Sequence, residues 1–111
     1  MTIHELDRFD DEAATRRLFT DLDRRITDLN RTHIREEAGT ITEERIIALA
    51  KVVSRLRARY LQAALTLGEA ASAELDSTVV EQLHRRRAAY EEALHAFGAL
   101  RHAIKRGYFK T

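Results

Sequence analysis

The chain has 111 residues, of which 44% are hydrophobic and 33% charged, with no Pro, Cys or Trp and a formal net charge of +1. This length predicts one domain, 1–111, and the apolar content is too high for a disordered chain. The absence of cysteine excludes disulfides, thiolate zinc sites and a cysteine nucleophile. No long apolar run and no signal-peptide pattern is present, so we expect a cytoplasmic protein without a membrane span.

The first expected helix runs over residues 11–38. Asp10 and Asp11 offer N-cap oxygens, and Gly39 can adopt the left-handed backbone that ends a helix. The apolar positions form one row at helical spacing, which predicts a narrow packing surface. This row consists of Leu18, Leu22, Ile26, Leu29 and His33.

A second start signal lies upstream of this helix. Thr2 and Glu5 have the spacing of a capping box, in which each side chain accepts a hydrogen bond from the backbone of the other residue. We expect a short additional turn there, carrying Ile3, Leu6 and Phe9.

The second expected helix runs over residues 42–71, with Thr40 or Thr42 as its N-cap. Its seam has alternating steps of three and four residues, the repeat of helices that pack nearly in line. The seam consists of Ile46, Leu49, Val53, Leu56, Tyr60, Ala63, Leu67 and Ala70. A neighbouring row adds Ile47, Ala50, Ser54, Ala58, Leu61 and Leu65. Two apolar rows predict a wide buried arc, which favours this helix as the centre of a bundle.

The third expected helix runs over residues 77–106, capped by Asp76 or Ser77, and a tail follows over 107–111. Its seam repeats the same alternation through Val79, Leu83, Arg86, Tyr90, Ala93, Phe97, Leu100 and Ile104. A short turn near residue 75 predicts an antiparallel hairpin in which the numbers of facing residues sum to about 150. Tyr60 should therefore face Tyr90, and Val53 should face Phe97.

These elements predict an all-α fold of three long helices, with the second and third as a hairpin and the first beside it. A helix of 28 residues is about 42 Å long. A bundle this thin has few core layers for its surface, which favours a homodimer, although a monomeric three-helix bundle stays open.

Two Glu-x-x-His pairs, Glu81 with His84 and Glu92 with His95, could each present two ligands on one side of the third helix. Di-iron bundles use this pattern, together with further inward glutamates from other helices. The second expected helix has glutamates only at its ends. A solvated polar face is therefore the favoured interpretation. We expect no cofactor, and a metal shared between subunits is an alternative.

Basic side chains concentrate in the last third of the chain. Residues 77–111 carry seven Lys or Arg against three Glu, whereas residues 1–40 carry seven Arg against ten Asp or Glu. Nucleic-acid binding is a second alternative, because arginines can hold phosphates. It would use Arg85, Arg86, Arg87, Arg101, Lys105 and Arg106. In contrast, Arg55, Arg57 and Arg59 fan out on the second helix in the manner of a solvated surface.

Leu22-Asp23-Arg24-Arg25-Ile26, with Arg16 upstream, resembles the first helix of the small all-helical chorismate mutases. Members of that family are dimers that bind a dicarboxylate through arginines and lysines. In this sequence His33, Glu44 and Leu56 stand where three of those basic residues would fall. The resemblance therefore does not extend to the activity.

No catalytic motif is present, so we expect a non-enzymatic helical protein that self-associates and binds a partner protein, as adaptors and assembly chaperones do. Its interface is expected to use apolar seam positions of the second and third helices. These are Leu49, Val53, Leu56, Tyr60, Leu83, Tyr90, Phe97, Leu100 and Ile104.

Overall fold

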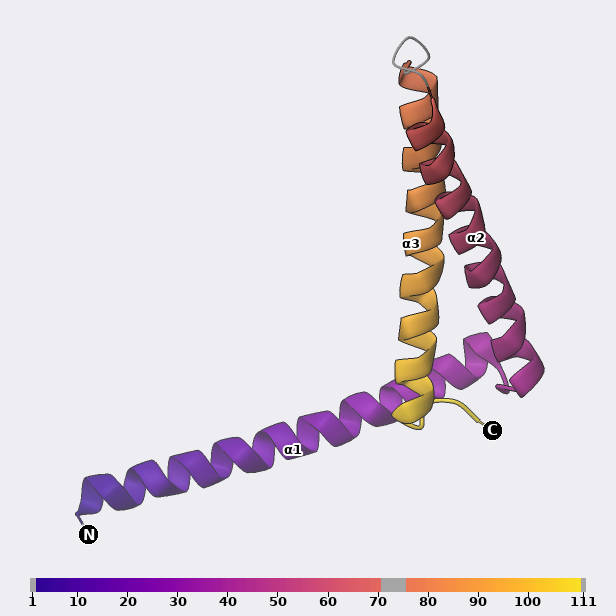
Figure 1. Ribbon diagram of the computed structural model, residues 1–111. Coiled ribbons are helices and arrows are strands. Elements are labelled where there is room, and N and C mark those ends of the chain that lie inside the picture. Colours follow the sequence, from indigo (N-terminus) through magenta and orange to yellow (C-terminus); the bar gives the residue numbers. More distant parts are fainter. Residues whose placement is uncertain (1, 71–75, 111) are drawn as a thin grey trace. The chain divides into compact units, whose positions relative to one another are not determined.

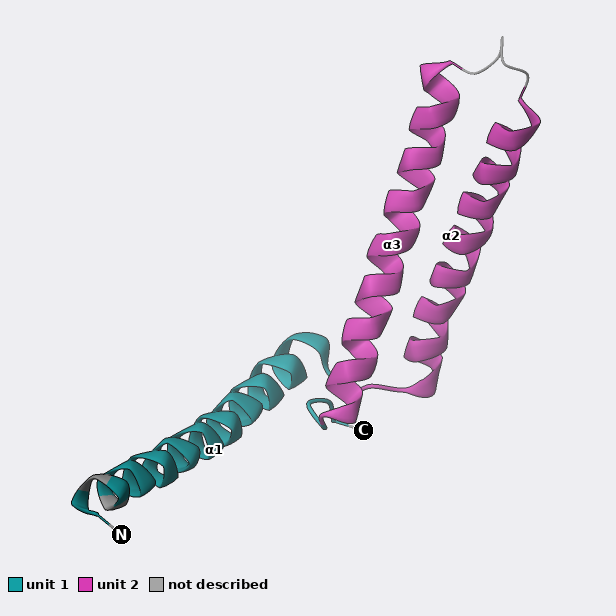
Figure 2. Cartoon of the chain, turned by 60° about the vertical axis from the view of Figure 1, so that its left-hand side comes forward, with its two compact units in different colours: residues 1–40, 107–110 teal, residues 41–106, 111 magenta. Residues whose placement is uncertain are grey.

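The computed structural model describes residues 2–70 and 76–110. It consists of three helices, α1 (Ile3–Ala38), α2 (Glu43–Glu69) and α3 (Ser77–Lys105) (Figure 1). The predicted all-α class and number of helices are confirmed. The predicted end of the second helix at residue 71 and the centre of the turn lie outside the described residues. The chain divides into unit 1, formed by α1 with the segment 107–110, and unit 2, formed by α2 and α3 (Figure 2).

Helix α1 begins at the capping box rather than at Asp10 or Asp11. The Thr2 hydroxyl accepts from the Glu5 amide at 3.2 Å, and Glu5 Oε2 accepts from the Thr2 amide at 2.8 Å. The chain has neither Gly nor Pro between Ile3 and Ala38, so nothing interrupts the helix after this start. The prediction of a separate short turn is wrong, because that turn is the first turn of one continuous helix.

The other helix ends follow local capping chemistry. Thr42, not Thr40, caps α2 and accepts from the Arg45 amide at 3.3 Å. Asp76 caps α3 and accepts from the Val79 amide at 3.1 Å. Gly39 and Gly107 follow α1 and α3 with positive φ angles of 75° and 73°, a conformation that glycine tolerates best. The predicted stop at Gly39 is therefore confirmed, and Gly107 follows the end of α3 in the same way.

Helices α2 and α3 lie side by side and antiparallel in both views (Figures 1 and 2). The Tyr60 and Tyr90 rings stack across the hairpin with their centroids 5.8 Å apart, which confirms the predicted register at this pair. Val53 and Ala63 are each 6% exposed and form the buried core among the described residues. The other seam positions of both helices are half-buried.

The prediction of a wide buried arc on α2 is wrong. Its first row packs in the hairpin, whereas Ile47, Leu61 and Leu65 in the second row are 46%, 54% and 65% exposed. The reason is geometric: one neighbouring helix covers one narrow strip of a helix surface. A second apolar row can become buried only against another partner.

Candidate interaction surface

The middle of the hairpin carries a cluster of two tyrosines and two arginines, Arg57, Tyr60, Arg87 and Tyr90, here called the tyrosine–arginine centre. Arg57 Nε donates to the Tyr90 hydroxyl at 3.0 Å, and its guanidinium carbon lies 5.3 Å from the centre of that ring. Arg57 therefore spans from α2 to α3. Arg57 is exposed, as the interpretation of a solvated surface predicts, and it also joins the two helices, which that interpretation did not include.

Arg87 occupies the corresponding position on the opposite helix. Its Nε donates to Glu91 Oε1 at 2.8 Å. The bond to Glu91 and the charge of that carboxylate raise the pKa of Arg87, with a smaller contribution from Tyr60 across the hairpin. Arg87 is exposed, so water screens this pairing. The guanidinium is charged at every ordinary pH.

A short sequence repeat explains why each helix contributes one arginine and one tyrosine to this centre. Arg57-Ala58-Arg59-Tyr60 and Arg87-Ala88-Ala89-Tyr90 both have an arginine three residues before the tyrosine. On antiparallel helices this spacing places each arginine on the same side of the hairpin, beside the tyrosine of the other helix. The repeat is visible in the sequence, and it is the signal that would have identified Arg57 as part of the centre.

The predicted interface residues lie within the hairpin seam. Val53 is buried, and the other members of that set are half-buried on α2 and α3. The structure brings Tyr60 and Tyr90 together directly. A role of these residues across a subunit interface stays a prediction.

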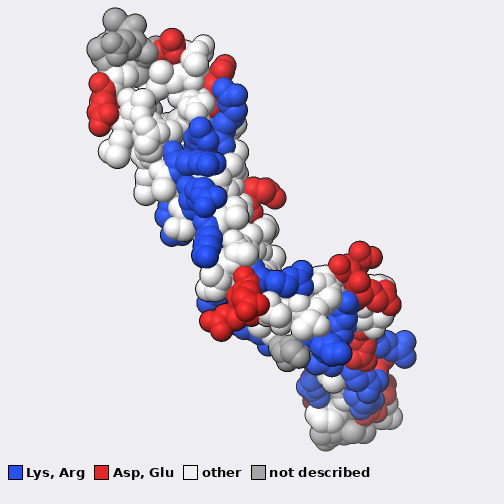
Figure 3. Space-filling model, turned by 90° about the vertical axis from the view of Figure 1, so that its right-hand side faces the viewer, with Lys and Arg blue, Asp and Glu red and all other residues white. Residues whose placement is uncertain are grey.

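The predicted basic triplet divides into different environments. Arg86 is half-buried and donates to Gln82, at 3.2 Å from Nε and 3.0 Å from Nη2, in the amide orientation that satisfies both side chains. Arg85 and Arg87 are exposed, as are Arg101, Lys105 and Arg106. Lys and Arg side chains gather along the middle of the hairpin on the face shown in Figure 3.

The two Glu-x-x-His pairs point to solvent. Glu81, His84, Glu92 and His95 are all exposed. Among the described residues no group of three or more His, Asp or Glu side chains is placed to hold a metal ion. The sharing of a metal between subunits stays a prediction.

Helix α1 carries an exposed apolar row, here called the α1 stripe, which consists of Leu18, Leu22, Ile26 and Leu29. These four side chains are between 39% and 56% exposed, and His33 at the end of the predicted row is exposed as well. The predicted narrow packing surface is therefore exposed in the described part of the chain, and its burial against a second subunit stays a prediction. A helix presents its apolar side for burial, and nothing in the described part of unit 1 buries this one.

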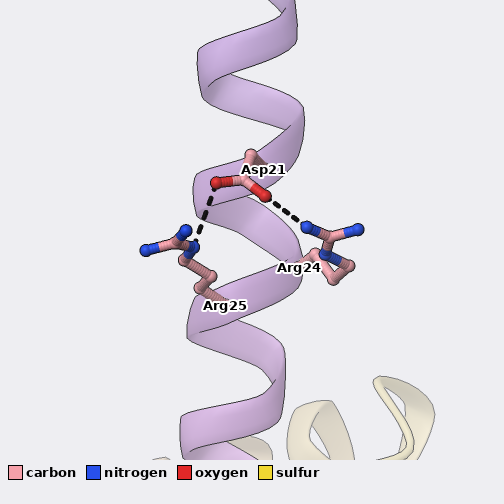
Figure 4. Close-up of polar contacts among 3 residues, drawn as sticks. All are labelled: Asp21, Arg24 and Arg25. Atoms are coloured by element: carbon pink, nitrogen blue, oxygen red, sulfur yellow. Dashed lines mark hydrogen bonds and ion pairs between the residues drawn. The ribbon is translucent and has the colours of Figure 1, made fainter.

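Ion pairs along α1 border the stripe. Asp21 accepts from Arg24, and its other oxygen lies 3.0 Å from Arg25 Nε (Figure 4). Asp28 lies 3.9 Å from Arg31 Nη1. Such exposed pairs contribute little to stability, typically below about 1 kcal/mol each. Their effect here is to place charges of both signs beside the apolar row.

No described helix combines the length and the apolar character that crossing a bilayer requires. Comparison with known proteins identified no matching family model, curated protein or solved structure.

Proposed function

We propose that the chain is a non-enzymatic helical module that self-associates and binds a protein partner through apolar helix faces. The observation that supports this is the exposure of two regular apolar rows, the α1 stripe and the second row of α2. Rows at helical spacing that remain half-exposed are typical of interaction surfaces, whereas single exposed leucines are not.

The energy available from covering these rows is substantial. Complete burial of a Leu or Ile side chain contributes about 1.5–3 kcal/mol. Because about half of each side chain in the α1 stripe remains exposed, covering all four would contribute on the order of 3–6 kcal/mol. The hairpin alone has only Val53 and Ala63 as buried core among its described residues, so a further packing partner would add stability to a thin structure.

Solution mass tests the self-association. We expect a molar mass of at least two subunits in light scattering across micromolar to hundred-micromolar concentration. A mass of one subunit throughout that range would overturn the proposal. Leu22→Glu should shift the mass toward one subunit, and Thr20→Glu, on the opposite side of α1, serves as the matched control.

Polyanion binding is a second candidate, favoured by the basic side chains gathered on the hairpin in Figure 3. Arg55, Arg59 and Arg85 are exposed and available for phosphate contacts. This function predicts binding to a duplex that weakens steeply with salt, and a smaller salt dependence when these arginines are replaced by glutamine. Absence of binding at low salt would exclude it.

A further inference from the structure

The α1 stripe and the tail of the chain occupy opposite sides of α1. Arg31 Nε donates to the Gly107 carbonyl at 3.1 Å, and Thr40 forms a backbone bridge with Lys110. Ile34, Tyr108 and Phe109 are half-buried in the same unit. Arg31 follows Leu22 by nine residues, or about two and a half turns, so these side chains point in opposite directions. The tail therefore leaves the α1 stripe open.

Unit 2 has an apolar face on one side of its hairpin, here called the hairpin face: Ile47, Leu61 and Leu65 of α2 with Val80 and Leu94 of α3. These side chains are between 40% and 65% exposed. Val80, Arg87 and Leu94 recur every seven residues along α3, and Leu61 lies one turn beyond Arg57 on α2. Arg57 and Arg87 each lie three residues before one of the stacked tyrosines, so on antiparallel helices the two rows lie on the same side of the hairpin.

The shapes of the two surfaces are complementary. The α1 stripe is a single row, and the hairpin face offers two rows on neighbouring helices. A row of side chains on one helix packs into the groove between the rows of a facing pair. Three helices with this arrangement bury the apolar residues that two helices leave exposed.

We infer that the α1 stripe of one copy docks on the hairpin face of a second copy of this chain. This rests on the self-association proposed above and names its contact surfaces. A symmetric dimer forms the contact twice, because each copy donates its stripe and accepts that of its partner. Two contacts double the apolar burial, which favours a second copy over an unrelated helix that would form the contact once.

The charges of the two segments also favour a second copy of the chain as the partner of the α1 stripe. The hairpin face is crossed by Arg57 and by Arg87, which is paired with Glu91. The α1 stripe is bordered on one side by Asp21 and Asp28, which are paired with arginines of α1. The difference between the two segments is therefore one of net charge. Residues 1–40 have three more acidic than basic side chains, and residues 77–111 have four more basic than acidic ones. Two copies of α1 facing each other would instead bring two acidic segments together.

Thiol cross-linking tests this contact without background, because the chain has no cysteine. One variant carries Leu22→Cys in the α1 stripe. The other carries Ser54→Cys; Ser54 is exposed and lies seven residues before Leu61, on the same side of α2. A size tag on one variant identifies mixed products. After equilibration and treatment with a short bismaleimide, we expect a mixed dimer as the major product. Thr20→Cys replaces Leu22→Cys as the control and should reduce the yield at least several-fold.

The double variant Leu22→Cys/Ser54→Cys shows whether the α1 stripe docks on the hairpin face of another chain or on that of its own chain. We expect a covalent dimer, because the two thiols meet between chains. An internally cross-linked monomer would overturn the inference, and so would a Leu22→Cys homodimer as the main product of the mixture. If the chain is a dimer by mass but gives no mixed product, the docking inference is overturned and the proposed self-association is retained. If the chain is a monomer by mass, both are overturned.

Discussion

The Tyr60 and Tyr90 rings stack across the hairpin with an angle of 24° between their planes, and Arg57 Nε donates to the hydroxyl of Tyr90. The stack and the hydrogen bond can be separated by mutation. Tyr90→Phe retains the ring and removes the acceptor, so it should lower the free energy of unfolding by less than about 1 kcal/mol. Tyr90→Ala removes a half-buried ring and should lower it by about 2 kcal/mol. Urea unfolding measures both, and equal losses would contradict the stacking role.

Adjacent valines on α2 provide a direct measure of burial in the seam. Val53 is 6% exposed and Val52 is 45% exposed. Val53→Ala removes two buried methyl groups and should destabilise the chain by about 2 kcal/mol. Val52→Ala should change the free energy of unfolding by less than about 0.5 kcal/mol. Thermal or urea unfolding of the pair checks this, and a larger loss at Val52 would show that a partner covers that position.

Substitution by alanine at Gly107 and at Gly98 should change the free energy of unfolding in opposite directions. Gly107 has a φ of +73°, and a Cβ there would meet only Arg31 Nη2 at 3.6 Å, so the cost arises from the backbone. Gly107→Ala should therefore destabilise by about 1 kcal/mol. Gly98 lies inside α3 with open space where a Cβ would lie, and Gly98→Ala should stabilise by about 0.5–1 kcal/mol. A destabilising Gly98→Ala would indicate that another chain approaches α3 at this point.

The capping box at Thr2 should control the first turn of α1. Thr2→Ala removes the acceptor for the Glu5 amide and should cost about 1 kcal/mol locally. We expect faster amide hydrogen exchange at Glu5 without a change in the exchange of α2. Glu5→Gln is the matched control, because glutamine at this position also accepts from the cap backbone. Unchanged exchange in Thr2→Ala would show that α1 begins at a later residue.

Periodicity and capping residues were sufficient to predict three helices and the facing of Tyr60 and Tyr90 across the hairpin. Helix ends depend on nearby residues: Asp76 caps α3, and Gly39 and Gly107 follow α1 and α3, as the sequence indicates. The start of α1 was predicted eight residues too late, although Thr2 and Glu5 carried the correct signal. Two competing N-terminal signals cannot be ranked from capping chemistry alone when no residue between them breaks the helix.

The surface was harder to predict than the fold. The Arg-Ala-x-Tyr repeat was present in the sequence, but its meaning depends on antiparallel packing that brings Arg57 to Tyr90. In the same way, Leu61 and Val53 both belong to apolar rows of α2, and the sequence does not distinguish between them. Only the structure shows that Val53 is buried and Leu61 is exposed.

By itself, the sequence determined where the helices run and which of their sides are apolar, because both properties depend on residues a few positions apart along the chain. The tertiary structure decided which apolar side meets another helix, since one packed neighbour covers a single row. In this protein α3 covers the seam of α2, whereas the residues of the α1 stripe and the hairpin face remain between 39% and 65% exposed.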